Sequence, residues 1–150
     1  MLKQISGIIL FLIVPATFLM AQNSHSPADL DQYQWENRLL LIFAPSDTSD
    51  FFHTQISEFE GRKKGFHDRD LKTLYLLGDG TSQVEGEPIS VLATEQLYED
   101  YNVPENTMTV ILIGKDGTEK LRTGQLLTIL KLFSVIDAMP MRKQEMNGGS

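Results

Sequence analysis

An unbroken apolar run, Leu39–Phe43, constrains the fold of this chain more than any other feature of its sequence. A strand that is apolar at every position is typical of a sheet covered on both faces, as in parallel α/β structures. The run stops at Ala44 and Pro45, and the polar turn Ser46–Asp50 leads into a new apolar pattern. Because backbone N–H groups converge where a strand ends and a helix begins, α/β proteins often place ligands at such turns. The sequence therefore predicts a buried strand followed by a candidate site.

The residues after this turn predict a helix and a second strand. The apolar residues of segment 52–59 recur at the spacing of one helix face, and another apolar run, 74–77, follows. Two buried strands that flank a helix predict a right-handed βαβ unit with parallel strands. Gly61 and the basic residues 62–64 are expected at the end of the helix, because cations stabilise a helix C-terminus.

The second half of the chain predicts a helix, a hairpin and a closing helix. Residues 79–93 are the least regular part, and Ser90 or Thr94 is expected to cap the helix that follows. Two extended runs around Lys115–Gly117 predict a β-hairpin. The closing helix is expected to end at Pro140 and to carry an apolar stripe of Leu126, Ile129, Leu130, Phe133 and Ile136.

The single tryptophan, Trp35, lies before the first strand, in a segment (30–35) expected to form one helical turn. Asp29 or Asp31 is suited to cap that turn. An exposed Trp35 would provide an aromatic binding platform, whereas the burial statistics of tryptophan favour a residue that anchors the turn in the core. We therefore expect Trp35 to be buried.

Both ends of the chain are expected to lie outside the folded domain. Residues 1–21 have the pattern of a cleaved secretory signal peptide: the basic Lys3, an apolar core and the small residue Ala21 at a plausible cleavage site. A membrane anchor is the alternative, but the apolar stretch is short for spanning and polar residues follow at once. We expect an exported protein, periplasmic or extracellular. Its expected parts are a flexible segment at 22–28, one domain at 29–146, and a polar tail that frays from 143 and is disordered at 147–150.

Composition excludes several classes of function. The chain contains no cysteine, so it forms no disulfide and performs no thiol–disulfide exchange or thiol peroxidase chemistry. It carries 13 Lys and Arg against 20 Asp and Glu, for a net charge of −7 that becomes about −8 without residues 1–21. An acidic surface without a basic stripe repels phosphate backbones, so no nucleic-acid partner is expected. No membrane contact is expected after the signal peptide is removed.

The predicted order of elements, β-α-β-α-β-β-α, resembles the thioredoxin fold. In that fold a strand like 39–43 ends in Ala-Pro and is followed by a redox Cys-x-x-Cys. The matching positions here read Asp47, Thr48, Ser49 and Asp50. The resemblance implies an α/β domain with a mixed sheet of four or five strands and helices on both faces.

A more specific resemblance rests on segments that span most of the domain. They are Arg38–Ser46, Arg69–Leu71, Gly78–Gly80, Gly114–Gly117 with Arg122, and Ile136–Arg142. Together they resemble a bacterial family known as domain of unknown function 4174. Similar domains occur in animal extracellular-matrix proteins with sushi repeats, for which a peroxiredoxin-like fold has been proposed. The resemblance implies the fold and secretion, and it implies no established reaction.

The polar turn itself has a structural and a functional interpretation. Asp, Ser and Thr are the residues that cap helices, and a cap contributes about 1 kcal/mol, so capping is the favoured interpretation. Asp47, Asp50 and His53 are three residues apart and could present two carboxylates and an imidazole to a metal. Ligands at this spacing diverge around a helix, so no metal site is predicted. His67 is interpreted as a loop residue.

Two arginines each follow an apolar element and match a motif of the family. Arg122 and Arg142 could each hold a carboxylate or phosphate group through two parallel hydrogen bonds. The alternative, which we favour, is a structural ion pair of one of them with Asp116 or Asp137 that pins the closing helix to the hairpin.

The predicted function is that of a non-catalytic binding module with a protein or peptide partner and no cofactor. The candidate binding surface comprises Ser46, Asp47, Thr48, Ser49, Asp50, Thr107 and Met108. The pair at 107–108 lies about where thioredoxins carry a cis-proline, and Pro104 comes too early to replace it. Peptide binding by the usual thioredoxin route is therefore not predicted.

The alternative function is a cysteine-independent enzyme. It would use Asp47, Asp50 and one arginine on a small anionic or peroxidic substrate. A helix N-terminus lowers the pKa of a carboxylate, which makes it a poor proton donor at neutral pH, so the binding module is favoured.

Overall fold

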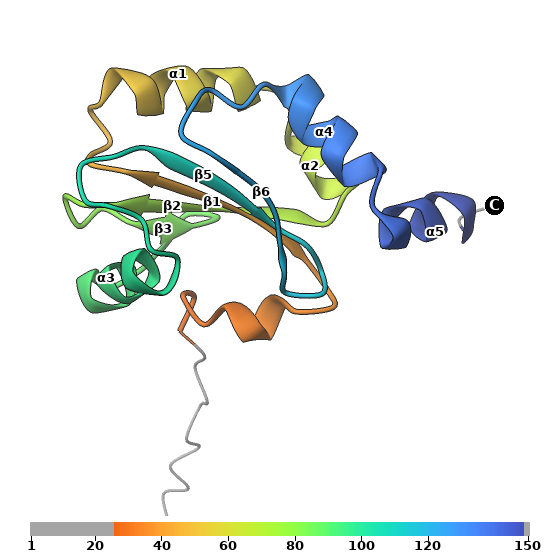
Figure 1. The fold of residues 1–150 in the computed structure, drawn as a ribbon, viewed down its shortest axis with the longest axis horizontal. Coiled ribbons are helices and arrows are strands. Elements are labelled where there is room, and N and C mark those ends of the chain that lie inside the picture. The colour runs from red at the N-terminus through yellow and green to blue at the C-terminus, as the bar shows by residue number, and fades with distance from the viewer. Residues whose placement is uncertain (1–25, 149–150) are drawn as a thin grey trace, which may run out of the picture.

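The computed structural model describes residues 26–148 (Figure 1). The signal peptide predicted at 1–21 lies outside the described residues. In chain order, the elements are the 3-10 helix η1 (Leu30–Tyr33), β1 (Arg38–Ala44), α1 (Asp50–Phe59), α2 (Lys63–His67), β2 (Leu71–Leu77), β3 (Gln83–Val84), β4 (Glu87–Pro88), α3 (Val91–Asp100), β5 (Thr109–Ile113), β6 (Glu119–Thr123), α4 (Ile129–Asp137) and α5 (Pro140–Gly148). Among these residues, no helix combines the length and apolar character needed to cross a bilayer.

The strands form one mixed sheet in the order β4-β3-β2-β1-β5-β6. β1 and β2 run parallel, with Leu41 opposite Leu74, and the other neighbouring pairs are antiparallel. The predicted pairing of the two apolar runs is therefore confirmed, as is the hairpin of β5 and β6. Within residues 26–148 the sheet has six strands instead of the four or five predicted, because segment 79–93 contains the hairpin β3–β4. Strands of two residues are too short to show an alternating pattern.

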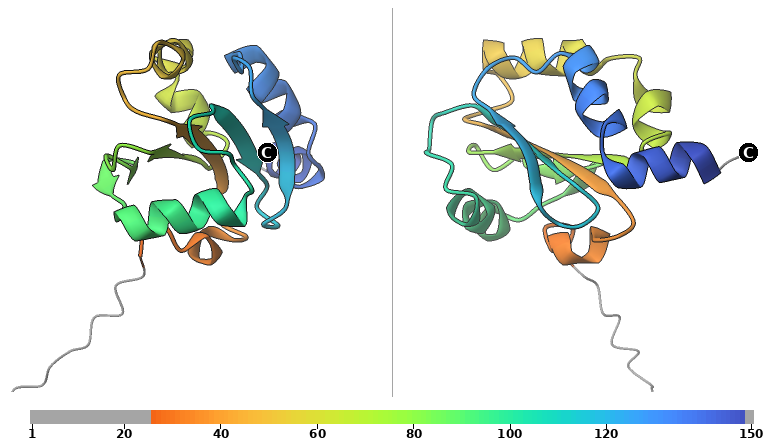
Figure 2. Two further views of the ribbon diagram at one scale, coloured as in Figure 1. Left: turned by 60° about the vertical axis from the view of Figure 1, so that its left-hand side comes forward. Right: turned by 45° about the vertical axis from the view of Figure 1, so that its right-hand side comes forward.

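Helices cover both faces of the sheet, as the views in Figures 1 and 2 show. α1, α2 and α4 lie on one face, where Leu40 packs in a core with Phe52 and Leu132. α3 and η1 lie on the other face, where Leu39 packs in a second core with Leu97. Successive residues of β1 point into opposite cores, which is why this strand is apolar at every position. The predicted mixed sheet with helices on both faces is confirmed.

Hydroxyl side chains begin the three longest helices of the two main layers. Ser49, Ser90 and Thr128 each accept a hydrogen bond from the backbone N–H three residues later, at the start of α1, α3 and α4. Each cap satisfies an N–H group that the helix itself leaves unpaired, which is worth about 1 kcal/mol. Of the two caps considered for α3, the structure uses Ser90.

The prediction for Trp35 is wrong. Its side chain is 61% exposed, and its φ of 70° lies in the left-handed region. The backbone turns sharply here because the Trp35 N–H donates to the Lys115 carbonyl at 2.6 Å, and this turn leaves the ring in solvent. Leu30 and Tyr33 of η1 pack on the core instead. The cap of this turn is Asp29, one of the two candidates.

The flexible segment predicted at 22–28 is wrong for its last three residues. Ala28 packs against the second core, and the Pro27 carbonyl accepts a hydrogen bond from the Tyr33 hydroxyl at 3.2 Å. The Ser26 carbonyl accepts from the Asp29 N–H at 2.8 Å. Residues 22–25 lie outside the described part of the chain.

The basic residues after Gly61 do not end α1. That helix ends at Phe59, and Gly61 takes a φ of 71°, which a glycine adopts without strain. Lys63 and Lys64 belong to the short helix α2 that follows. The two lysines therefore belong to α2 and not to the C-terminus of α1.

The closing helix begins later than predicted, and its buried stripe is narrower. α4 starts at Ile129, so Leu126 precedes it and is 40% exposed, and Leu130 is 80% exposed. The buried face consists of Ile129, Leu132 and Ile136. The frayed tail predicted from 143 is also wrong, because residues through Gly148 form α5; residues 149–150 lie outside the described part.

Candidate functional site

The turn between β1 and α1 is organised by its own hydroxyl groups. The Ser49 hydroxyl accepts from the Phe52 N–H at 3.4 Å and donates to the Ser46 carbonyl at 3.2 Å. The Ser46 and Thr48 hydroxyl oxygens lie 3.0 Å apart. Three of the five polar side chains are therefore used to shape the turn and cap α1.

The turn also carries two carboxylates, those of Asp47 and Asp50. Asp47 and Asp50 are exposed, and neither carboxylate forms a hydrogen bond or an ion pair within residues 26–148. The Asp47 backbone N–H, however, donates to a carboxylate oxygen of Asp79 at 3.2 Å. This bond joins the turn after β1 to the turn after β2.

Asp79 is the junction of these two turns. Its other carboxylate oxygen accepts from the hydroxyl and the backbone N–H of Thr81, at 2.7 and 3.1 Å. The hydrogen bond from the Thr81 hydroxyl, together with those from the backbone N–H groups of Thr81 and Asp47, lowers the pKa of Asp79. Next to it, a Cβ at Gly78 would lie 3.1 Å from the Pro45 carbonyl oxygen, so this close approach of two backbones suits glycine.

Tyr98 connects α3 to the same ends of β1 and β2. Its hydroxyl oxygen lies 3.0 Å from both the Ala44 and the Leu76 carbonyl oxygens, and its ring meets Phe43 edge-on at 4.9 Å. Burial raises the pKa of Tyr98 to about 12, and the nearby carboxylates of Asp79 and Glu105 act in the same direction. The hydroxyl therefore stays protonated and acts as a hydrogen-bond donor that fixes α3 on the sheet.

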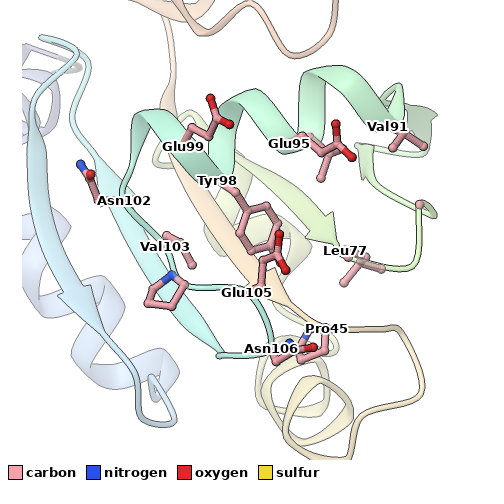
Figure 3. Close-up of a pocket in the computed structure, with 14 residues that line it drawn as sticks. Pro45, Leu77, Val91, Glu95, Tyr98, Glu99, Asn102, Val103, Glu105 and Asn106 are labelled. Atoms are coloured by element: carbon pink, nitrogen blue, oxygen red, sulfur yellow. The ribbon is translucent and has the colours of Figure 1, made fainter.

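A groove of about 780 Å³ lies between α3, the ends of β1 and β2, and the loop 102–106 (Figure 3). We call it the α3 groove. In Figure 3 Tyr98 extends from α3 toward β1, and Pro45 and Asn106 come from the two loops that close one end. Its apolar lining comprises Pro45, Leu77, Val91, Tyr98, Val103 and Pro104. Val91 is 54% exposed, so part of this apolar surface faces solvent.

The charged lining of the α3 groove is entirely acidic. Glu95 and Glu99 are one turn apart on α3, and Glu105 lies on the facing loop. All three are exposed, and none of the groove-lining residues, which fall within the described chain, is Lys, Arg or His. The groove therefore combines an apolar floor with a negative rim, which favours a ligand with apolar and basic groups.

The two loops of the candidate binding surface lie at one end of this groove. β1 and β5 pair antiparallel with Phe43 opposite Thr109, so the turn 46–50, which follows β1, lies beside residues 107–108, which precede β5. The Thr107 hydroxyl donates to the Pro104 carbonyl at 2.7 Å, and Met108 packs partly buried against the first core. The loops thus border the α3 groove, although the groove is lined by their neighbours Pro45 and Asn106.

Arg122 and Arg142 are both held by neighbouring groups. Arg122 forms an ion pair with Glu119 at 2.7 Å and donates to the Tyr101 carbonyl at 3.0 Å. Arg142 pairs with Asp137 at 3.3 Å and donates to the Asp68 carbonyl at 2.7 Å.

The hairpin is joined to the C-terminal helix by a lysine and not by Arg122 or Arg142. Asp116, the other proposed arginine partner, pairs with Lys120 at 2.7 Å. The contact between the hairpin and the C-terminal helix is made by Lys115, which pairs with Glu145 at 2.9 Å.

No metal centre emerges from the geometry of the described residues. Within residues 26–148, no group of three or more His, Asp or Glu side chains converges to hold a metal ion. Asp47, Asp50 and His53 are all exposed on the first turn of α1 or just before it. His67 ends α2 and is exposed.

The residues that sequence reasoning missed are those of α3. Glu95, Tyr98 and Glu99 come from a helix whose apolar pattern predicted only its packing, and Glu105 comes from a loop. A signal was present, since two glutamates and a tyrosine fall on adjacent turns of one helix. Their convergence on Pro45 depends on the chain reversal between α3 and β5, which no local pattern encodes.

The family described as Domain of unknown function (DUF4174) matches residues 29–145, which cover most of the chain. This chain belongs to that family. The match covers every element of the α3 groove and of the two loops beside it. It also agrees with the resemblance that the sequence motifs indicate.

Curated relatives of this DUF4174 domain are longer proteins. It is 26% identical to the rat sushi repeat-containing protein SRPX over 120 residues, which are 78% of this chain and 26% of the relative. It is 24% identical to zebrafish (Danio rerio) coiled-coil domain-containing protein 80 over 133 residues, which are 78% of this chain and 15% of the relative. The chain thus spans about a quarter or less of these proteins.

Solved structures similar to this DUF4174 domain include peroxiredoxins. The reduced 2-Cys peroxiredoxin of Plasmodium vivax matches with a TM-score of 0.57 and 18% identity, over 77% of this chain and 84% of that one. Plasmodium yoelii thioredoxin peroxidase I matches with a TM-score of 0.58 and 17% identity, over 81% of this chain and 82% of that one. The fold is therefore thioredoxin-like, as predicted, in a chain that contains no cysteine.

Proposed function

We propose that this domain is an exported, non-catalytic binding module that holds a basic peptide segment of a partner protein in the α3 groove. One observation carries the proposal: the charged side chains lining the groove, Glu95, Glu99 and Glu105, are all acidic and surround an apolar floor. A cysteine-free chain on a peroxiredoxin-like fold cannot perform the thiol chemistry of a 2-Cys peroxiredoxin. Binding is the function that remains supported by a formed groove.

The dimensions and chemistry of the groove suit a short extended segment. Its volume of about 780 Å³ lies within the range of ligand pockets in proteins. Apolar side chains of a partner would contact Val91 and Pro104, and Lys or Arg side chains would pair with the glutamates. The loops that carry Ser46–Asp50 and Thr107 would contact the end of the segment, because they border the groove at Pro45 and Asn106.

The alternative of an enzyme that joins Asp47 to an arginine has less support. Arg142 bonds to the Asp68 carbonyl before β2, whereas Asp47 bonds to Asp79 after β2. The seven residues of β2 lie between them, a length of about 20 Å. Charges separated by much more than one Debye length, about 8 Å at physiological salt, do not act as a catalytic pair. Arg122 is already occupied by Glu119.

The test compares a short peptide of alternating Lys and Leu with the same peptide carrying Glu for Lys. Fluorescence anisotropy measures binding to the full mature chain and to a variant with Glu95, Glu99 and Glu105 changed to Gln. We expect the Lys peptide alone to bind, and the variant to bind it about tenfold more weakly, from three ion pairs of about 0.5 kcal/mol each. Affinity should also fall as salt rises.

A matched control removes the same charge elsewhere. Glu36, Glu60 and Glu87 are exposed, lie outside the α3 groove and form no ion pair within residues 26–148. Their change to Gln should leave peptide affinity nearly unchanged. An equal loss of peptide affinity in both triple variants would mean that net charge alone causes the loss, and it would contradict a binding site in the groove. Asp47→Ala and Asp50→Ala test whether the neighbouring turn contributes.

Export is tested on the protein from its native host. N-terminal sequencing should find a mature chain that begins near Gln22. An intact Met1 on a cytosolic protein would contradict export while leaving the binding site unaffected.

A further inference from the structure

α5 is held on the domain mainly by charged groups. None of its residues is buried, and the three that are partly buried are Met141, Arg142 and Glu145. Figures 1 and 2 show α5 at the opposite end of the molecule from α3. A helix with little buried apolar surface belongs to the least stable part of a fold and can detach locally.

The Glu145 carboxylate lies between two cations that belong to the body of the domain. Its oxygens are 3.1 and 3.2 Å from the two terminal nitrogens of Arg38, and one of them is 2.9 Å from the Lys115 ammonium. The side chain of Arg38 is 1% exposed and that of Lys115 is 11% exposed, whereas that of Glu145 is 26% exposed. The cations are therefore built into the domain, and the anion comes from its periphery.

Arg38 has hydrogen-bonding capacity that Glu145 does not use. One terminal nitrogen also donates to the Arg69 carbonyl at 2.8 Å, but the buried Nε–H has no hydrogen-bond partner among residues 26–148. A buried donor left unpaired costs free energy. A guanidinium matches the oxygens of carboxylate and phosphate groups, and an anion with more oxygens could satisfy more of its donors.

The charge of the site favours an anion once Glu145 is removed. Lys115 also pairs with Asp70 at 2.8 Å, and Arg142 lies 3.5 Å from Glu145 on the same helix. With α5 displaced, Arg38 and Lys115 remain against the single carboxylate of Asp70. This is a local excess of positive charge in a chain whose net charge is −7.

We propose that Arg38 and Lys115 form an anion-binding site that Glu145 occupies in this structure, and that the oxyanion group of an external ligand binds there when α5 is displaced. The ligand class is defined by a phosphate or carboxylate group. The site lies at the opposite end of β1 from the α3 groove and does not rest on the function proposed for that groove.

The test uses Trp35 as a built-in reporter. Trp35 is the single tryptophan of the chain, and its backbone N–H donates to the Lys115 carbonyl at 2.6 Å. Its fluorescence is titrated with inorganic phosphate, and separately with acetate, with ionic strength kept constant by NaCl. Glu145→Gln should bind the preferred anion about tenfold or more tightly than the wild type, because Glu145 no longer competes. A larger response to phosphate identifies phosphate-bearing ligands, and a larger response to acetate identifies carboxylate-bearing ligands.

Two variants make the comparison specific. Glu119→Gln removes a carboxylate from the exposed pair with Arg122 and should bind like the wild type. Arg38→Met in the Glu145→Gln background should abolish the gain. The proposal is overturned if neither anion binds Glu145→Gln more tightly than the wild type, or if the gain persists without Arg38.

Folding and displacement are checked on the same proteins. If Glu145→Gln does not fold, Glu145→Asp, which shortens the side chain, carries the same comparison. Failure of both to fold in phosphate or acetate overturns the proposal, because an external oxyanion should replace the carboxylate. In the wild type, saturating anion should reduce the hydrogen-exchange protection of residues 140–148, and increased protection would count against displacement.

Discussion

The guanidinium of Arg38 and the carboxylate of Glu145, 107 residues apart in the chain, form two hydrogen bonds of 3.1 and 3.2 Å. Burial raises the pKa of Glu145, but the hydrogen bonds from Arg38 and Lys115 outweigh it, so the pKa is lowered overall. A carboxylate with a lowered pKa in the folded state contributes stability above its unfolded pKa of about 4.3. That contribution is lost as the pH falls through the folded pKa.

Glu145→Gln should therefore destabilise the domain more than Arg38→Met. The first change leaves Arg38 buried and charged without its anion, at a cost of about 2 kcal/mol in the free energy of unfolding, below the 3–5 kcal/mol of fully buried pairs because Glu145 is partly exposed. The second leaves Glu145 partly solvated and still paired with Lys115. Urea unfolding of both variants measures the difference. The reverse order would show that packing of the Arg38 side chain dominates.

Gln55→Leu should be among the most destabilising single changes. Gln55 is fully buried in α1, and its amide donates to the Leu127 carbonyl and accepts from the Leu127 N–H, both at 2.9 Å. Leucine would fill the space but leave two buried backbone groups unpaired, at a cost of about 3 kcal/mol. Chemical denaturation measures this loss in the free energy of unfolding. Gln96→Leu, at an exposed position of α3, is the control and should change stability by less than about 0.5 kcal/mol. A similar loss in both variants would contradict the stabilising role of the hydrogen bonds between Gln55 and Leu127.

The local features of this fold could be predicted from the sequence because they depend on neighbouring residues. The apolar run of β1 specifies a strand buried on both faces, and the Ser49 hydroxyl specifies the start of α1. The order of the elements followed from the apolar runs, the helical periods and the turn residues of the sequence. The apolar run of β1 and the Ser49 cap of α1 together therefore predicted the position of the turn beside the α3 groove.

The features that could not be predicted depend on residues distant in the chain. The groove requires Glu95 of α3 to face the loop of Glu105 across the ends of β1 and β2. The packing of α5 on the domain depends on Glu145, which meets Arg38 and Lys115 from far earlier in the chain. Trp35 is exposed because of a backbone hydrogen bond to Lys115, which overrides the usual preference of tryptophan for the interior.

Tyr98→Phe should remove a hydrogen bond at the base of the α3 groove and cost about 1 kcal/mol at neutral pH. The pKa of Tyr98 is raised by burial to about 12, above its ordinary value of 10.0. The protonated phenol therefore stabilises the fold fully below pH 10, and this contribution is lost as the pH rises toward 12. The free energy of unfolding, measured from pH 8 to 12, should fall less steeply in Tyr98→Phe than in the wild type. Parallel curves would mean that Tyr98 ionises equally in both states.

Ser49→Ala tests whether the polar turn after β1 serves chiefly as a helix cap. Its hydroxyl accepts from the Phe52 N–H and donates to the Ser46 carbonyl, so its loss should cost about 1 kcal/mol. Asp47→Ala and Asp50→Ala should each change stability by less than about 0.5 kcal/mol, because neither carboxylate has a partner within residues 26–148. Ser57→Ala, at an exposed position of the same helix, controls for helix propensity. Thermal unfolding compares the four variants. A cost for either aspartate equal to that of Ser49 would mean that a carboxylate, and not the hydroxyl, caps α1 in solution.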